Sequence, residues 1–327
     1  MKRIRKGTIA IQKSRRHISM QKLAPVGILL VLVVCVSIGN PKFLRWNSIN
    51  SIFQQIAATG IVAMGAMVVL LTGGLDFTSG NGLAMCGVFA GVMYFNFGES
   101  MFSLVFAGIA LGACLGFVNG FLITKCNLKP FVATLATMAF TQGLTLLISE
   151  GRTAFLNHPL TFEIGGGNLF GVLSIPFVIF LCVALLTSYI LNHTRFGTYI
   201  YAIGGNEEAA RFVGINVTKY KWLAYIFAGI CTGTASVIAI CRVGQIAPNL
   251  EGTYLMDGIA AAIIGGTSPS GGRGKVFGTI IGVLILGVVS SALTFLRVTS
   301  TAQTAVKGLI ILLAIVIDSL FNLVKKD

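Results

Sequence analysis

The run Met101-Phe-Ser-Leu-Val-Phe-Ala-Gly-Ile-Ala-Leu-Gly-Ala-Cys-Leu-Gly-Phe-Val-Asn-Gly-Phe-Leu-Ile123 contains no charged residue. A helix needs about 20 such residues to cross the hydrocarbon core of a bilayer. Small residues let membrane helices approach closely, and glycine recurs here at every fourth position from Gly108 to Gly120. We therefore predict a membrane-spanning helix whose glycine ladder packs against another helix of the same chain.

Similar apolar runs repeat along nearly the whole chain of 327 residues. Only 10% of the residues are charged, whereas soluble domains carry roughly 25%. Strand-like alternation is absent, which argues against an outer-membrane barrel. The sequence predicts an all-α polytopic membrane protein with about ten spans, at approximately 23–39, 52–71, 82–97, 101–123, 131–149, 172–191, 222–241, 257–267, 276–296 and 303–321.

The distribution of Lys and Arg predicts the orientation of these spans. Eight Lys and Arg residues precede residue 23, and segments rich in these residues stay on the cytoplasmic side of a membrane. With ten spans, the basic segments around 125–129, 195–221 and 273–275 also fall inside. We expect both termini in the cytoplasm, with a basic tail at 1–22 and a transmembrane domain at 23–327.

The net charge of +14 is explained by this positive-inside pattern, so nucleic acid is not expected as a partner. The seven cysteines form no CxxC motif, and no metal site or cofactor is predicted. A phosphate-binding loop is also absent, because Gly274-Lys275 is followed by Val276 rather than by Ser or Thr. We therefore expect that the chain is not an enzyme, and that if it transports a solute at the expense of ATP, the ATPase is a separate polypeptide.

The longest polar interval after the N-terminal tail is Tyr201-Ala-Ile-Gly-Gly-Asn-Glu-Glu-Ala-Ala-Arg-Phe-Val-Gly-Ile-Asn-Val217. Asn206 suits a helix N-cap, and the two glutamates after it suit the positive end of the helix dipole. Gly214 suits a left-handed C-terminal cap. A helix of about two turns is not stable alone in water, so it must be held by the membrane domain or by a partner.

Two glycine pairs interrupt apolar runs in similar ways. They lie in Leu71-Thr-Gly-Gly-Leu-Asp-Phe-Thr-Ser-Gly80 and Ile263-Ile-Gly-Gly-Thr-Ser-Pro-Ser-Gly-Gly272. Duplicated helix breaks are typical of transporters. We expect helix breaks at Gly73, Gly74, Gly265 and Gly266.

Asp76 lies within the first break, where an ionised carboxylate is costly in a bilayer. It is either a pathway or gating residue or an N-cap for the following helix. Polar residues also occur in the fourth and fifth spans, where hydrogen bonding between helices is the simpler role for any one of them. As a group they are candidates for lining the substrate pathway: Asn119, Thr134, Thr137 and Gln142.

From about residue 50 onward the chain resembles the ribose/xylose/arabinose/galactoside-type permeases of bacterial ABC importers. Thr72-Gly-Gly-Leu-Asp-Phe-Thr-Ser-Gly80 is similar to the Gly-Gly-Ile-Asp-Leu-Ser-Val-Gly segment of that family, and Pro130-Phe-Val-Ala-Thr-Leu135 to its Pro-Phe-Ile-Ala-Thr-Leu-Gly. The segments 195–217 and 260–274 also match the family. Several motifs in the same order make a chance match very improbable.

The resemblance implies a bacterial inner-membrane subunit that works with an ATP-binding subunit, a periplasmic solute-binding protein and a second permease copy or a related permease. The loop at about 193–221 is then the cytoplasmic coupling loop. The resemblance assigns ATPase coupling to Asn206, Glu207, Glu208, Ala209, Ala210, Arg211, Gly214 and Ile215. In this assignment the small alanines let the helix sit close in a groove, and Arg211 pairs with an acid there.

Two alternatives belong to other classes. An ion-coupled secondary sugar transporter would need a coupling-ion site, and intramembrane acids are scarce in this chain. A non-transporting membrane scaffold would have no obvious use for helix breaks and interior polar residues. Copurification of an ATPase would separate both alternatives from an importer.

Overall fold

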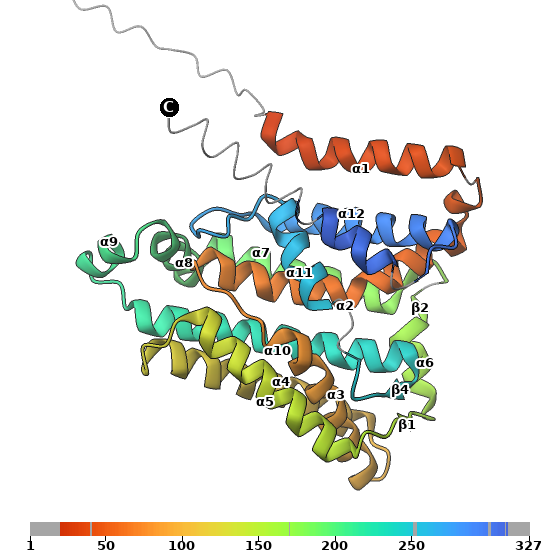
Figure 1. The fold of residues 1–327 in the computed structure, drawn as a ribbon, viewed down its shortest axis with the longest axis horizontal. Helices are drawn as coiled ribbons and strands as arrows, with labels where there is room; N and C mark the ends of the chain where they lie inside the picture. The colour runs from red at the N-terminus through yellow and green to blue at the C-terminus, as the bar shows by residue number, and fades with distance from the viewer. Residues whose placement is uncertain are drawn as a thin grey trace, which may run out of the picture.

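The computed structural model describes residues 20–39, 41–169, 171–250, 254–299, 302–310 and 312. Helices account for nearly all of the regular structure in these residues, and Figure 1 shows them running side by side in one bundle. The all-α polytopic architecture predicted from the apolar runs is confirmed. Most of the predicted basic tail, residues 1–19, lies outside the described residues.

Among the described residues, six helices are long and apolar enough to cross a membrane. They are α2 (Trp46–Leu71), α4 (Met101–Thr124), α5 (Pro130–Ser149), α7 (Ile175–His193), α10 (Val217–Val243) and α12 (Val276–Phe295). Each of the six coincides with a predicted span.

The other predicted spans correspond to shorter or less apolar helices. These are α1 (Met20–Gly39), α3 (Ser79–Asn96) and α11 (Tyr254–Ile264). The last predicted span, 303–321, is described only at 302–310 and 312, which are helical. The count of ten spans and the location of the termini therefore remain predictions.

Helix α2 forms the centre of the bundle. In the most apolar 18 residues of α2, 83% of the residues are buried inside the protein. The corresponding share is 28% in α5 and 28% in α7. Around α2 pack α7, α10, α11 and α12, and together they form the largest apolar core. The more exposed helices present large apolar side chains outward, as expected of surfaces that face lipid.

The glycine ladder of α4 packs against α10, as predicted. A methyl group at Gly112 would overlap the carbonyl of Gly229, and one at Gly116 would overlap the carbonyl of Tyr225. Because glycine lacks a side chain, the two backbones touch along this seam. The glycine ladder therefore packs two helices of this chain against each other.

Short elements cover one end of the bundle, on the right in Figure 1. They include η1 (Pro41–Leu44) and α6 (Pro159–Gly166). Four two-residue strands form two antiparallel pairs: β1 (Ala154–Phe155) with β4 (Gln245–Ile246), and β2 (Asn168–Leu169) with β3 (Leu173–Ser174).

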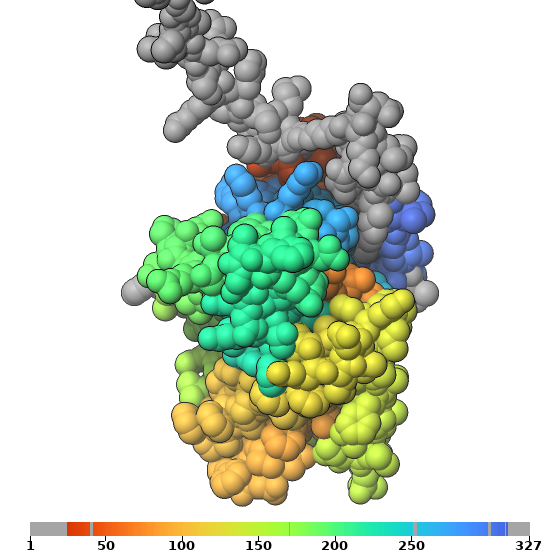
Figure 2. All heavy atoms as spheres, turned by 90° about the vertical axis from the view of Figure 1, so that its left-hand side faces the viewer, coloured from red at the N-terminus to blue at the C-terminus, as the bar shows by residue number. Residues whose placement is uncertain are grey.

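The opposite end carries α8 (Arg195–Gly205) and α9 (Glu207–Phe212), on the left in Figure 1. Figure 2 looks onto this end and shows α8 and α9 at its centre, between the 125–129 segment and the 265–275 segment. The described residues of this end include Lys125, Lys129, Arg195, Arg211, Lys219, Lys221, Arg273 and Lys275. Those of the opposite end include fewer basic residues, namely Lys42, Arg45, Arg152, Arg242 and Arg297. This asymmetry is the pattern from which the cytoplasmic side was predicted.

Both glycine-rich interruptions are loops in the structure. The first, 72–78, joins the end of α2 to the start of α3, and the second, 265–275, joins α11 to α12. Gly73 has φ +74° and Gly266 has φ +90°, which residues with side chains rarely adopt. Gly265 instead lies against the backbone of Gly278, where a methyl group would not fit.

Candidate coupling site and polar network

Helix α9 begins with a side-chain cap. The backbone N–H of Ala209 donates to Asn206 Oδ1 at 2.9 Å, which satisfies one of the free amides of the first turn. Glu207 and Glu208 follow directly, near the positive end of the helix dipole. The predicted N-cap is confirmed. The preceding helix α8, which runs to Gly205, was not predicted.

The C-terminus of α9 has the hydrogen bonds of a Schellman motif. Ile215 N donates to Ala210 O at 3.0 Å, and Gly214 N donates to Arg211 O at 3.0 Å. Gly214 adopts φ +83°, the left-handed conformation that this motif requires. Inside the turn, Ala210 is buried against Ile203, Ile215 and Val217.

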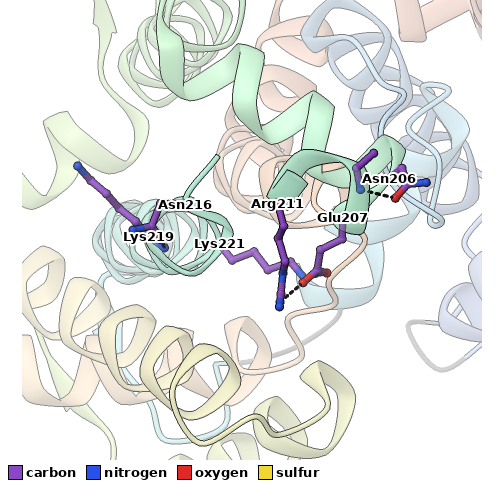
Figure 3. A network of polar contacts seen from close by, with 7 residues as sticks. Asn206, Glu207, Arg211, Asn216, Lys219 and Lys221 are labelled. Atoms are coloured by element: carbon purple, nitrogen blue, oxygen red, sulfur yellow. Dashed lines mark hydrogen bonds and ion pairs between the residues drawn. The ribbon is translucent and has the colours of Figure 1, made fainter. Parts of the chain in front are cut away.

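Glu207 is the centre of an ion-pair cluster that ties α9 to α10. Its carboxylate lies 2.7 Å from Arg211 on α9 and also contacts the ammonium of Lys221 on α10. Figure 3 shows both cationic side chains converging on it. Partial burial alone would raise the pKa of Glu207, but Lys221 and Arg211 together outweigh it and lower the pKa below its ordinary value.

The other predicted coupling residues divide into two groups. Glu208, Ala209 and Arg211 are exposed, whereas Ala210 faces the chain itself. Arg211 pairs with Glu207 in the same helix, with 64% of its side chain exposed. Of the two alanines, only Ala209 is thus accessible to a partner.

An apolar tip follows these residues. Phe212 is 90% exposed and Val213 is 76% exposed. The folding of this chain alone therefore buries little of either side chain. Large exposed apolar side chains on a polar surface mark interaction sites. The sequence analysis did not select either residue. The signal was an aromatic residue, Phe212, between the charged first turn of the helix and its glycine cap.

The end of α8, directly before α9, lies on a junction of backbones, which we call the glycine junction: Gly73, Gly204, Gly271 and Gly272. Gly272 N donates to Leu71 O at 3.0 Å, which joins the two helix breaks. A methyl group at Gly204 would overlap Leu71 O, and one at Gly271 would lie 2.8 Å from Gly204 O. The end of α8 therefore touches both breaks with no side chain between them.

Tyr201 adds a side-chain link at the same place. Its hydroxyl donates to Gly274 O at 2.9 Å. Burial raises the pKa of Tyr201, so the phenol keeps the proton that it donates. Helix α8 is thus joined to the 265–275 segment by both backbone contact and a hydrogen bond.

Three of the predicted pathway residues meet at the start of α3, around Thr78. The Thr78 N–H donates to Asp76 Oδ1 at 2.9 Å, and the Thr78 hydroxyl donates to Thr134 O at 3.2 Å. Asn119 Nδ2 donates to Thr78 Oγ1 at 2.7 Å. Asn119 Oδ1 is buried and accepts no hydrogen bond from the described residues. Thr78, which the sequence analysis did not select, is the residue that connects the others.

The remaining two pathway candidates do not join this network. Thr137 is buried, and its hydroxyl donates to Ala133 O of its own helix at 3.0 Å. Gln142 is exposed, farther along α5. Among the described residues no group of three or more His, Cys, Asp or Glu side chains is placed to hold a metal ion.

Residues 48–315 match the family described as "Branched-chain amino acid transport system / permease component". The chain belongs to this permease family. The match covers most of the described bundle, including α2 to α12 and both helix breaks. No solved structure matches the permease.

Curated relatives cover nearly the whole permease. The ribose import permease protein RbsC of Bacillus subtilis (strain 168) is 40% identical over 91% of this chain and 93% of its own length. The protein of the same name from Escherichia coli (strain K12) is 39% identical over 89% and 91%. The L-arabinose transport system permease protein AraH of Escherichia coli (strain K12) is 35% identical over 88% and 87%. None of these three is named as an ion-coupled transporter, so the comparisons do not support that alternative.

Proposed function

We propose that this chain is the membrane-spanning subunit of an ATP-driven, binding-protein-dependent importer in the bacterial inner membrane. Its solute is a monosaccharide or a related small polar molecule, in line with relatives named for ribose and arabinose. A separate subunit hydrolyses ATP. The observation that carries the proposal is α9, a capped helix on the basic end of the bundle whose apolar tip, Phe212, is 90% exposed.

In this proposal α9 is the coupling helix. Phe212 and Val213 enter a groove of the ATP-binding subunit, while Glu208, Ala209 and Arg211 line the contact. The other predicted residues hold the helix in place: Asn206 and Gly214 cap it, Glu207 ties it to α10, and Ala210 and Ile215 pack beneath it. Aromatic residues and arginine are the side chains that most often anchor protein interfaces.

The glycine junction connects the coupling helix to the transport path. Motion of α9 moves Gly204, which touches the breaks before α3 and after α11. An interface packed backbone to backbone changes by discrete rearrangement rather than by gradual deformation. Nucleotide-driven motion of the ATP-binding subunit would thus open the path at both breaks.

The solute path runs past the start of α3 in this proposal. Asp76, Asn119 and Thr134 form its polar network, with Thr137 and Gln142 farther along α5. A second permease copy, or a related permease, completes the path, and lipid covers the remaining apolar faces. Residues 1–22 form a cytoplasmic tail, residues 23–327 the membrane domain, and 193–221 the cytoplasmic coupling loop.

The test is affinity purification of the tagged permease from its native host in mild detergent. We expect an ATP-binding subunit and a solute-binding protein to copurify, and vesicles that contain all three to take up sugar only with ATP. Recovery of the permease alone in several detergents, together with sugar uptake driven by an ion gradient, would overturn the proposal.

A further inference from the structure

A chamber lined by both polar and apolar residues lies in the bundle on the side away from the coupling helix. It has a volume of about 220 Å³ and is bounded by α2, α10, α11, α12 and the 302–310 helix. A cavity needs only about 10–15 Å³ to hold one water molecule. This chamber is therefore many times larger than the space that one water molecule needs.

The chamber contains a buried ion pair. Lys307 Nζ lies 2.7 Å from Asp257 Oδ2, and the two side chains are only 11% and 9% exposed. Charged side chains within a membrane protein are costly and mark functional sites. The coupling site and the network around Thr78 make no use of this pair.

The walls combine further polar groups with apolar ones. The polar residues besides the pair are Gln55, Thr59, Arg242, Tyr254 and Ser290. The apolar residues are Ile56, Val283, Leu286 and Gly287. A few polar groups set in an apolar wall are the usual composition of a small-molecule site.

The position of the chamber suits a solute that arrives from the side opposite the coupling helix. Gln55 lies in the first three turns of α2, which begins at the end with the short strands. Arg242 and Ser290 lie close to the same ends of α10 and α12. In the proposed orientation this is the side of the periplasmic binding protein.

We propose that this chamber is a solute subsite that takes a neutral polyhydroxy molecule, such as an aldopentose, before it enters the path at α3. The inference rests on the proposed importer function. The Asp257 carboxylate accepts hydrogen bonds from sugar hydroxyls, Lys307 and Gln55 donate to them, and the ring of Tyr254 offers an apolar face. Because two cations and one carboxylate line the chamber, it is poorly suited to a coupling cation.

The test uses a single cysteine at Ser290, introduced into a variant that lacks the native cysteines. Ser290 lines the chamber, is 3% exposed and lies outside the ion pair. In vesicles that contain all subunits, a small methanethiosulfonate reagent should label the S290C side chain. Saturating D-ribose or L-arabinose should slow this labelling at least tenfold. A cysteine at Arg152, whose side chain is 82% exposed in the loop after α5, is the control and should label at the same rate with and without sugar.

A second measurement separates this inference from the importer function. The Ser290→Leu variant narrows the chamber, so we expect uptake to fall at least tenfold while the complex assembles and still hydrolyses ATP. Normal uptake by Ser290→Leu, or labelling of S290C that sugar leaves unchanged, would overturn the subsite while leaving the importer intact. Protection by sugar phosphates but not by neutral sugars would overturn the proposed ligand class. Failure of the unmodified complex to transport sugar would instead overturn the proposed function.

Discussion

The backbone N–H of Gly272 donates to the carbonyl of Leu71 at 3.0 Å, which joins the loop after α11 to the end of α2. These residues are some two hundred positions apart in sequence: Leu71 directly precedes the first helix break, and Gly272 lies within the second. Gly204 fills the space beside this hydrogen bond. The two breaks and the base of the coupling helix are therefore one structural unit.

The first prediction concerns Gly204. In the Gly204→Ala variant the added methyl group would overlap Leu71 O, which must then move and weaken its hydrogen bond to Gly272. We expect a loss of about 1–3 kcal/mol in stability, typical of overpacking a tight contact. Thermal unfolding in detergent measures this loss, and vesicle uptake measures its effect on transport.

Gly205 provides the matched control for Gly204. It is the next residue of α8, and nothing lies within 4 Å of a methyl group added there. Gly205→Ala should unfold at the temperature of the unmodified protein. Equal destabilisation by both substitutions would show that the close contacts of the glycine junction are not the cause of the loss, since alanine is the better helix former at either position.

The second prediction concerns Gly214, whose φ of +83° forms the left-handed cap of α9. Gly214→Val places a branched side chain in this conformation, at a cost of about 1–2 kcal/mol. We expect the cap to distort, so that ATP hydrolysis in the assembled complex continues without matching solute uptake. Gly214→Asn should retain coupling, since asparagine also adopts this conformation. Normally coupled uptake in Gly214→Val would contradict the docking role of α9.

The third prediction concerns Phe212 at the tip of α9. Because the side chain is 90% exposed, Phe212→Ala should leave the thermal stability of the permease unchanged. An interface anchor contributes about 2 kcal/mol or more, so affinity for the ATP-binding subunit should fall about 30-fold or more. Binding measured by biolayer interferometry with the purified subunit checks this.

Phe102 is the matched control for Phe212. It is 79% exposed and begins α4 at the end away from the coupling helix. Phe102→Ala should leave the affinity for the ATP-binding subunit unchanged. An equal loss of affinity in both variants would mean that the ATP-binding subunit does not recognise the tip of α9.

The fourth prediction concerns the pH dependence of the Glu207 cluster. The folded-state pKa of Glu207 is lowered from its ordinary value of 4.5, so the ionised carboxylate stabilises the fold. This contribution is fully present above pH 4.5 and is lost as the pH falls through the lowered folded-state pKa. Glu207→Gln should therefore reduce the melting temperature near neutral pH, and the difference should shrink as the solution is acidified below pH 4.5.

Glu208→Gln is the control for this measurement. Glu208 lies in the same first turn, is exposed, and forms no ion pair among the described residues. Its substitution should change the melting temperature less than that of Glu207 at neutral pH. If Glu207→Gln lowered the melting temperature by the same amount under acid conditions as at neutral pH, the ion-pair cluster would be ruled out as the cause.

The fifth prediction concerns the buried pair of Asp257 and Lys307. Removing one charge, as in Asp257→Asn or Lys307→Met, leaves the other charged group buried without its main counter-charge. Such changes cost about 3–5 kcal/mol, whereas replacing both charges is often nearly neutral. The double variant should therefore be more stable in thermal unfolding than either single variant. Strictly additive losses would show that the two groups do not stabilise each other.

Much of this protein follows from its sequence alone, because some of its physical constraints are local. A run such as 101–123 has no charge, and a bilayer requires every backbone polar group within it to be satisfied in a helix. The N-cap at Asn206 and the turn at Gly214 depend on neighbouring residues, so they too could be predicted. The family was visible in the order of several such local motifs.

Other features depend on contacts between residues distant in the sequence, and only the tertiary structure decided them. The glycine junction requires Gly73, Gly204 and Gly272 to meet, and a glycine in a glycine-rich chain does not indicate its partner. Lys221 reaches Glu207 only because α10 returns beside α9, and Lys307 reaches Asp257 only because the 302–310 helix packs against α11. Local patterns determine which helices form and where they end. The packing of those helices determines which polar groups share a site, since hydrogen bonds and ion pairs act over only a few ångströms.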